Sequence, residues 1–169
     1  MHQRLTILRH ANADSSNSTA DFDRPLTSTG QGEALRVWQW LAEQQSLPQL
    51  IVSSPAYRAR QTVEARVGPI ASTPVSLAFD ERLYLADLNN LLGIISETPA
   101  GTNHLMLVGH NPGLEHLLEF LLSQAPKSQD RILLQTATLA MLDYQQSWTT
   151  PSPACARLVR LIRATELIT

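Results

Sequence analysis

Four side chains in this sequence could bind and transfer an anionic group, and each lies close behind a predicted strand. Arg9 and His10 directly follow the apolar run Leu5–Leu8, and a polar stretch comes after them. Arg58 lies just beyond a second apolar run, and His110 just beyond a third. A guanidinium suits an oxyanion, and an imidazole can act as a nucleophile or carry a proton. Arg9-His10 alone could equally be a pair of surface residues, so the interpretation depends on whether the four side chains meet.

Strands and helices that alternate along the chain must position these residues. Apolar runs predict buried strands over residues 5–8, 50–52 and 104–108 and a shorter strand over 75–79. Apolar residues at helical spacing predict helices over residues 28–45, 56–67, 88–95 and 112–122. Residues 137–142 and 157–163 resemble further strands that complete the sheet. This alternation predicts an α/β fold with a mostly parallel sheet, in which the carboxyl ends of the parallel strands share one edge.

Capping residues indicate where the helices begin. Thr27 is a suitable N-cap for the first helix, and Ser54 for the second. Asn111 as N-cap, with Pro112 at the first helical position, predicts the start of the helix after the third buried strand. His110 would then lie at the positive end of a helix, where backbone N–H groups favour an anion.

The composition is that of an ordinary globular protein. The length of 169 residues favours one domain over residues 1–169, and the net charge of −2 gives no reason to expect nucleic acid or an anionic membrane as a partner. No apolar run approaches the ~20 residues that span a bilayer. The N-terminus leads directly into the first strand without room for a signal peptide, so we expect a cytoplasmic location. The single cysteine, Cys155, excludes an intrachain disulfide and has no nearby histidine to activate it.

The predicted cluster suits a doubly charged ligand such as a phosphoryl group. Two guanidinium groups, two imidazoles and a helix N-terminus would stabilise charge on its oxygens. The chain has neither a Walker-type glycine loop nor the glycine fingerprint of dinucleotide-binding folds. Glu115, His116 and Glu119 could be metal ligands or the solvent face of a leucine-rich helix. We favour the solvent face and expect no metal.

Three motifs of the sequence resemble those of the histidine phosphatase, or phosphoglycerate-mutase-like, superfamily. They are Arg9-His10 after a strand, the segment SSPAYRARQT at residues 53–62, and GHNPGL at residues 109–114. The resemblance covers nearly the whole chain in order. The short length, with RPLT at residues 24–27 and LYLA at residues 83–86, is most similar to the small SixA-type phosphohistidine phosphatases.

The resemblance implies a three-layer α/β/α sandwich and a phosphatase that needs no metal or other cofactor. It implies that His10 is the nucleophile and is phosphorylated during the reaction. Arg9 and Arg58 would hold the non-bridging oxygens, and His110, in its protonated form, would neutralise charge in the transition state. Ala11 stands where the family usually has glycine, and a negative φ at this residue would accommodate the change with only a small backbone shift.

Two further site residues are expected with less direct support from the motifs. The larger enzymes of the family carry a glutamate proton donor, and Glu81 stands at the comparable point of this chain. Asp80 is nearly as good a candidate, and both carboxylates could instead be solvated in a loop. Asn12 follows the histidine closely enough to donate a hydrogen bond to the phosphate.

The loops of this chain predict an open pocket. The longest of them, residues 11–27, is too short to build a large helical lid. An open pocket would admit a phosphorylated side chain, so we expect a phosphohistidine protein as substrate. Two alternatives remain: a phosphomonoesterase for a small-molecule phosphate, and a non-catalytic module that binds phosphoproteins. The complete set of His10, Arg9, Arg58 and His110 argues against the non-catalytic module.

Overall fold

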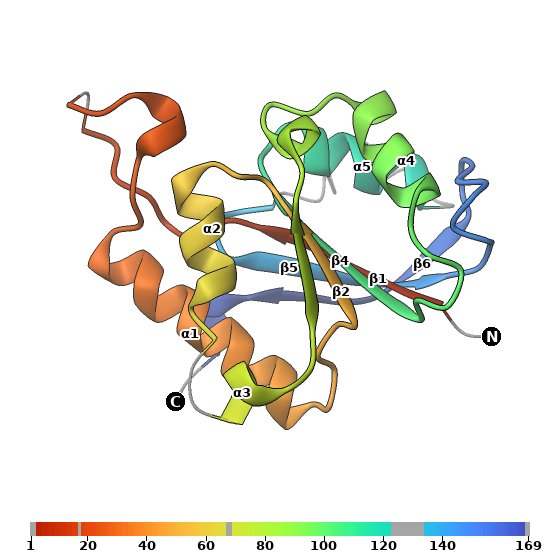
Figure 1. Cartoon of the computed structure of the whole chain (residues 1–169), viewed down its shortest axis with the longest axis horizontal. Helices are drawn as coiled ribbons and strands as arrows, with labels where there is room; N and C mark the ends of the chain where they lie inside the picture. Colours follow the sequence, from red (N-terminus) through yellow and green to blue (C-terminus); the bar gives the residue numbers. More distant parts are fainter. Residues whose placement is uncertain (1–2, 17, 67–68, 123–133, 168–169) are drawn as a thin grey trace.

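The protein is a central β-sheet with helices on both faces (Figure 1). The computed structural model describes residues 3–16, 18–66, 69–122 and 134–167. In these ranges the sheet has six strands, in the order β3-β2-β4-β1-β5-β6. The strands are β1 (Gln3–Arg9), β2 (Leu50–Ser53), β3 (Ser76–Phe79), β4 (His104–Gly109), β5 (Thr138–Tyr144) and β6 (Ala156–Arg163). Neighbouring strands from β3 to β1 pair in parallel, whereas β5 and β6 pair antiparallel. The predicted α/β fold with a mostly parallel sheet is confirmed.

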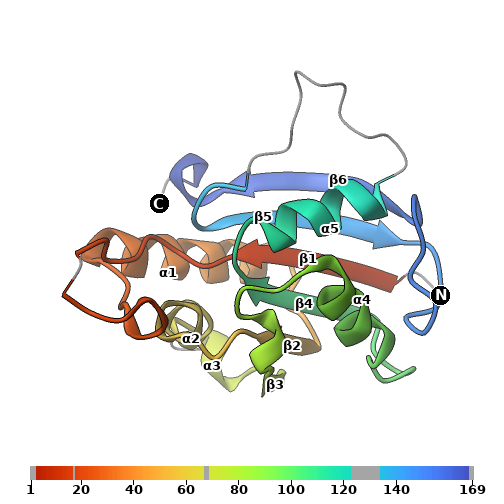
Figure 2. The same ribbon diagram turned by 90° about the horizontal axis from the view of Figure 1, so that it is seen from above.

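Helices cover the sheet in two layers, as Figure 2 shows from above. The helices are α1 (Ser28–Glu43), α2 (Tyr57–Glu64), α3 (Pro69–Ser72), α4 (Leu88–Ser96) and α5 (Gly113–Leu121), with single 3₁₀ turns η1 (Asp21–Asp23), η2 (Glu81–Leu83) and η3 (Ala164–Glu166). Helices α4 and α5 lie on one face, and α1, α2 and α3 lie on the other (Figure 1). Each layer has its own apolar core, with Leu91 and Leu117 on the first face and Trp38 and Val63 on the second. The predicted three-layer α/β/α sandwich is confirmed.

Strand β1 lies in the middle of the sheet and contributes to both cores. Leu5 and Ile7 belong to the core beneath α4 and α5, and Leu8 belongs to the core beneath α1 and α2. All three side chains are fully buried, as expected for a central strand covered on both faces. The parallel register pairs Arg9 with Gly109. The residues that follow β1 and β4 therefore emerge side by side at one edge of the sheet.

The N-cap predicted from the sequence is confirmed for α1, whereas the N-caps of α2 and α5 differ from those predicted. Thr27 caps α1, and its hydroxyl accepts a hydrogen bond from the Gly30 N–H at 3.0 Å. Helix α2 has its N-cap two residues after Ser54. Helix α5 begins at Gly113, so the prediction that Asn111 caps it is wrong. The Asn111 side-chain amide donates to Glu115 and to the Leu134 carbonyl instead. No helix in the described ranges is long and apolar enough to cross a membrane.

Candidate active site

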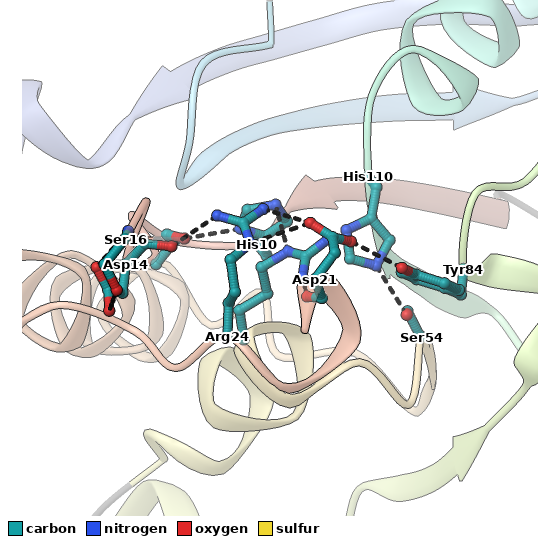
Figure 3. Close-up of polar contacts among 10 residues, drawn as sticks. His10, Asp14, Ser16, Asp21, Arg24, Ser54, Tyr84 and His110 are labelled. Atoms are coloured by element: carbon teal, nitrogen blue, oxygen red, sulfur yellow. Dashed lines mark hydrogen bonds and ion pairs between the residues drawn. The ribbon is translucent and has the colours of Figure 1, made fainter. Parts of the chain in front are cut away.

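The ends of β1 and β4 bring His10 and His110 close together (Figure 3), and Arg58 in the first turn of α2 contacts His10. The His10 and His110 rings are 5.0 Å apart between centroids. Arg58 points back from α2, and its Nε donates a hydrogen bond to His10 Nε2 at 3.2 Å. His10, His110 and Arg58 are buried, with 7, 6 and 3% of their surfaces exposed. The convergence expected from the parallel topology is therefore present in the structure.

The hydrogen bonds of His10 leave the lone pair of its ring on Nε2. Its Nδ1 lies 2.7 Å from the carbonyl oxygen of Ala11, which can only accept a hydrogen bond, so the ring proton belongs on Nδ1. Burial lowers the pKa of His10 to about 4, and the Arg58 and Arg9 cations contribute to this shift. The imidazole is therefore neutral at pH 7. The Ala11 N–H donates to the Thr62 hydroxyl at 3.0 Å, and Ala11 does not adopt a positive φ, as expected for alanine at this position.

His110 is held by Ser54 and has one ring nitrogen without a partner. Its Nε2 lies 2.8 Å from the Ser54 hydroxyl, whereas its Nδ1 is buried and has no hydrogen bond among the described residues. Burial, with the nearby His10 ring and Arg58, lowers the pKa of His110 to about 3. Burial and the neighbouring cation therefore favour a neutral His110 in the free site, and the protonated His110 expected in the transition state stays a prediction. Tyr84 places the edge of its ring against His110, with centroids 5.6 Å apart.

Arg9 extends toward residues far along the chain. Its Nη1 donates to the Leu134 carbonyl at 2.8 Å, while its buried Nε has no partner among the described residues. The same segment is held by Glu115, which accepts hydrogen bonds from the Leu134 N–H and the Asn111 amide. Glu115 thus orders the backbone beside Arg9. In the described part of the chain, no three His, Cys, Asp or Glu side chains are grouped to hold a metal ion.

Asp21, on η1, is a site residue that the sequence did not single out. Its Oδ2 accepts from Arg58 Nη2 at 3.1 Å and from the Tyr84 hydroxyl at 2.7 Å. Its Oδ1 accepts from Arg24 Nη2 at 2.8 Å. The Tyr84 hydrogen bond and the Arg24 and Arg58 cations hold the pKa of this carboxyl far below its usual range. The polar loop after His10 shows no periodicity that would distinguish this acid from its neighbours.

The predicted proton donors and Asn12 have other partners or none. Asp80 forms an ion pair with Arg82 at 2.7 Å and caps η2. Glu81 is exposed, and its side chain makes no hydrogen bond or ion pair with the residues that the structure describes. The Asn12 side-chain oxygen accepts from the Thr27 hydroxyl at 2.7 Å. None of the three side chains is hydrogen-bonded to His10, and their catalytic roles stay predictions.

Sequence comparison finds one family and a plant relative that are similar to this chain. A sequence model described as the histidine phosphatase superfamily (branch 1) matches residues 5–84. An uncharacterized chloroplastic protein of Arabidopsis thaliana is 35% identical over 158 residues, which cover 86% of this chain and 69% of the relative.

Two solved structures show the same fold over nearly the whole chain. A protein of Agrobacterium tumefaciens, provisionally named the phosphohistidine phosphatase SixA, is 29% identical with a TM-score of 0.79 and covers 96% of this chain and 98% of its own. The protein histidine phosphatase SixA complexed with tungstate is 20% identical with a TM-score of 0.79 and covers 98% of this chain and 100% of its own.

Proposed function

The chain belongs to the histidine phosphatase superfamily and is of the SixA type, and we propose that it dephosphorylates phosphohistidine on a protein. In this proposal, residues 1–169 form one catalytic domain, and His10 carries the phosphoryl group between two steps. The proposal goes beyond the family assignment in three respects: the substrate, the intermediate and the role of each side chain.

The observation that carries the proposal is a pair of buried polar atoms without partners in a site built around His10. Arg9 Nε and His110 Nδ1 are both buried and make no hydrogen bond within the described residues. Buried polar atoms without partners are rare, and each calls for an explanation. A phosphoryl group has three acceptor oxygens and a double negative charge, so it would satisfy Arg9 directly. It would also raise the pKa of His110, which could then donate from a protonated ring.

The reaction we propose has two steps at the phosphorus atom. In the first, the His10 Nε2 lone pair forms a bond to phosphorus, and the bond from phosphorus to the substrate nitrogen breaks with its electron pair. The leaving imidazole takes a proton, for which Glu81 or Asp80 is the proposed donor. In the second step water attacks the phosphorus, the bond to Nε2 breaks with its electron pair, and the carboxylate that gave up its proton in the first step takes one from the water. His10 is suited to this role because its pKa of about 4 keeps Nε2 unprotonated at pH 7.

Positive charge for both transition states would come from the side chains themselves. Arg9 and Arg58 would bind the non-bridging oxygens, as preorganised donors do where charge develops. We propose on this basis that no metal is required. The assignment of Asn12 as an additional phosphate donor requires its amide nitrogen to face the ligand while its oxygen stays with Thr27.

The choice of a phosphohistidine substrate rests on the leaving group. An imidazole departs more readily than an alkoxide and needs less help from an acid. Among the described residues, no carboxyl group is hydrogen-bonded to His10: Asp21 is ionised and bonded to Arg58, and Glu81 is exposed to solvent. This arrangement favours the phosphoramidate over an ester of a small metabolite.

A substrate panel tests the proposal. The wild-type protein and a His10→Ala variant would be assayed on a phosphohistidine protein, an aryl phosphate, and a set of sugar and nucleotide phosphates. We expect the phosphohistidine protein to give the highest kcat/KM and the variant to be inactive on all substrates. A higher kcat/KM on a sugar or nucleotide phosphate would favour the small-molecule phosphatase, and no turnover of any substrate would favour the non-catalytic binding module.

A further inference from the structure

Every side-chain nitrogen of Arg58 already has a partner in the protein. Its Nε donates to His10 Nε2 at 3.2 Å, its Nη1 donates to the main-chain carbonyl of Asp21, and its Nη2 donates to the Asp21 carboxylate. These contacts use three of the five N–H groups of Arg58, one of them on each terminal nitrogen, so a phosphoryl group that approaches Arg58 on the side of Asp21 competes with it for the same hydrogens. The hydrogen bond from Nε must also break before the His10 lone pair can attack phosphorus.

The Asp21 carboxylate resembles part of a phosphoryl group in its charge and hydrogen bonding. It is ionised, and its two oxygens accept hydrogen bonds from Arg58, Arg24 and Tyr84. Tyr84 in turn contacts the His110 ring, so the carboxylate lies among the groups that define the phosphate pocket (Figure 3). An anion in this position compensates the buried Arg58 cation while the pocket has no ligand.

A ligand can replace Asp21 in its contact with Arg58. The Asp21 side chain is 50% exposed, whereas that of Arg58 is 4% exposed. Asp21 belongs to a three-residue turn, η1, with no buried residue of its own. Its pair with Arg24, three residues along the chain, can persist when Arg58 is released. The carboxylate therefore has an alternative cation and access to solvent outside the pocket.

We propose that Asp21 is an internal competitor for the phosphate pocket, which occupies the terminal nitrogens of Arg58 until a phosphoryl group displaces it. This inference rests on the proposed phosphatase function. This competition lowers the affinity of the pocket for an oxyanion. A ligand that binds only molecules in which Asp21 has left Arg58 has an apparent affinity equal to its intrinsic affinity multiplied by the fraction of such molecules. A carboxylate that holds Arg58 in most molecules would weaken the binding of any oxyanion.

A different role for Asp21 gives the opposite prediction. If the carboxylate served only to hold Arg58 in the orientation that binds phosphate, removing its charge would leave the guanidinium poorly placed. Oxyanion binding would then weaken. The direction of the change in affinity separates competition from positioning.

The experiment measures the binding of tungstate, a tetrahedral oxyanion, to the full-length protein by isothermal titration calorimetry. The Asp21→Asn variant keeps the size of the side chain and removes its charge. Asp23→Asn is the matched control: Asp23 is exposed on the same turn, its side chain makes no hydrogen bond or ion pair with the described residues, and its replacement changes the net charge equally. Thermal unfolding of each variant checks that the fold is retained.

We expect Asp21→Asn to bind tungstate about tenfold more tightly than the wild-type protein, as the loss of one competing charge-assisted contact implies. Asp23→Asn should change the affinity by less than about twofold, because an exposed charge without contacts is screened. Weaker or unchanged binding by Asp21→Asn, or an equal gain in both variants, would overturn the competition. If neither the wild-type protein nor Asp21→Asn bound tungstate, the phosphate pocket itself would be contradicted.

Discussion

Replacing Arg58 with alanine tests the phosphate pocket at its most buried cation. The change removes a side chain that is 3% exposed and that donates to both His10 and Asp21. Loss of one preorganised donor to a developing oxyanion typically costs roughly 10²–10³ in rate, and Arg58 offers two terminal nitrogens to the phosphoryl oxygens. We therefore expect kcat/KM to fall about 10³-fold, which corresponds to about 4 kcal/mol of transition-state stabilisation.

The assay is the hydrolysis of an aryl phosphate at pH 7, at saturating as well as limiting substrate. Arg58→Lys should retain the charge but lose the planar pair of donors, so its kcat/KM should lie between those of the wild type and Arg58→Ala. Arg60→Ala is the matched control on the same helix, because Arg60 is exposed and contacts Glu64, at 3.9 Å, and the Phe79 ring rather than the site. Its activity should stay within about twofold of wild type.

One result would exclude this role for Arg58. If Arg58→Ala retained activity comparable to Arg60→Ala, while its thermal unfolding showed a folded protein, the buried guanidinium would not stabilise the transition state. The convergence of the two histidines would then need another chemical explanation.

Three further predictions concern residues around the site and the fold. Ser54→Ala removes the partner of His110 and should lower kcat/KM about tenfold, measured with an aryl phosphate; an unchanged value would show that Ser54 does not orient the ring. Burial and the Arg4 cation lower the pKa of His104 from 6.5 to about 4, so the unfolded chain binds its proton first. His104 should therefore contribute up to about 3 kcal/mol to the decrease in the free energy of unfolding as the pH falls from about 6.5 to about 4, in addition to the contributions of His10 and His110. His104→Gln should remove the His104 share in urea titrations at each pH, and an equal loss in the variant would contradict the assignment. A Cβ at Gly30 would lie 1.9 Å from the Asn12 carbonyl oxygen, so Gly30→Ala should lower the free energy of unfolding by about 2 kcal/mol or more, and an unchanged chemical-denaturation midpoint would contradict that clash.

The main cluster can be predicted from the sequence because its positions follow from strand ends. Leu5, Ile7 and Leu8 identify a buried strand, and parallel pairing brings the residue after β1 beside the residue after β4. The alternation of strands and helices along the chain therefore predicts that His10 and His110 lie at the same edge of the sheet, and the strand order of the structure makes β1 and β4 neighbours. Arg58 follows from the same logic, because side chains in the first turn of a helix lean toward its N-terminus.

Features that depend on irregular backbone or on burial could not be predicted in the same way. Asp21 lies on a short turn in a polar loop, where no apolar period indicates which side chain faces the pocket. The partner of Arg9, the Leu134 carbonyl, is 125 residues away and leaves no local signal. The charge state of His110 depends on how deeply its ring is enclosed, which the motif around it does not specify.

Locating the covalent intermediate tests the role of His10 most directly. The protein would be mixed with a phosphohistidine protein or an aryl phosphate, denatured within the first turnover at neutral or alkaline pH to preserve phosphoramidates, and digested for mass spectrometry. We predict a phosphoryl group on the peptide that contains His10, at His10 itself, and no labelled peptide from a His10→Ala variant. A phosphoryl group on another residue, or labelling that persists in His10→Ala, would contradict this mechanism.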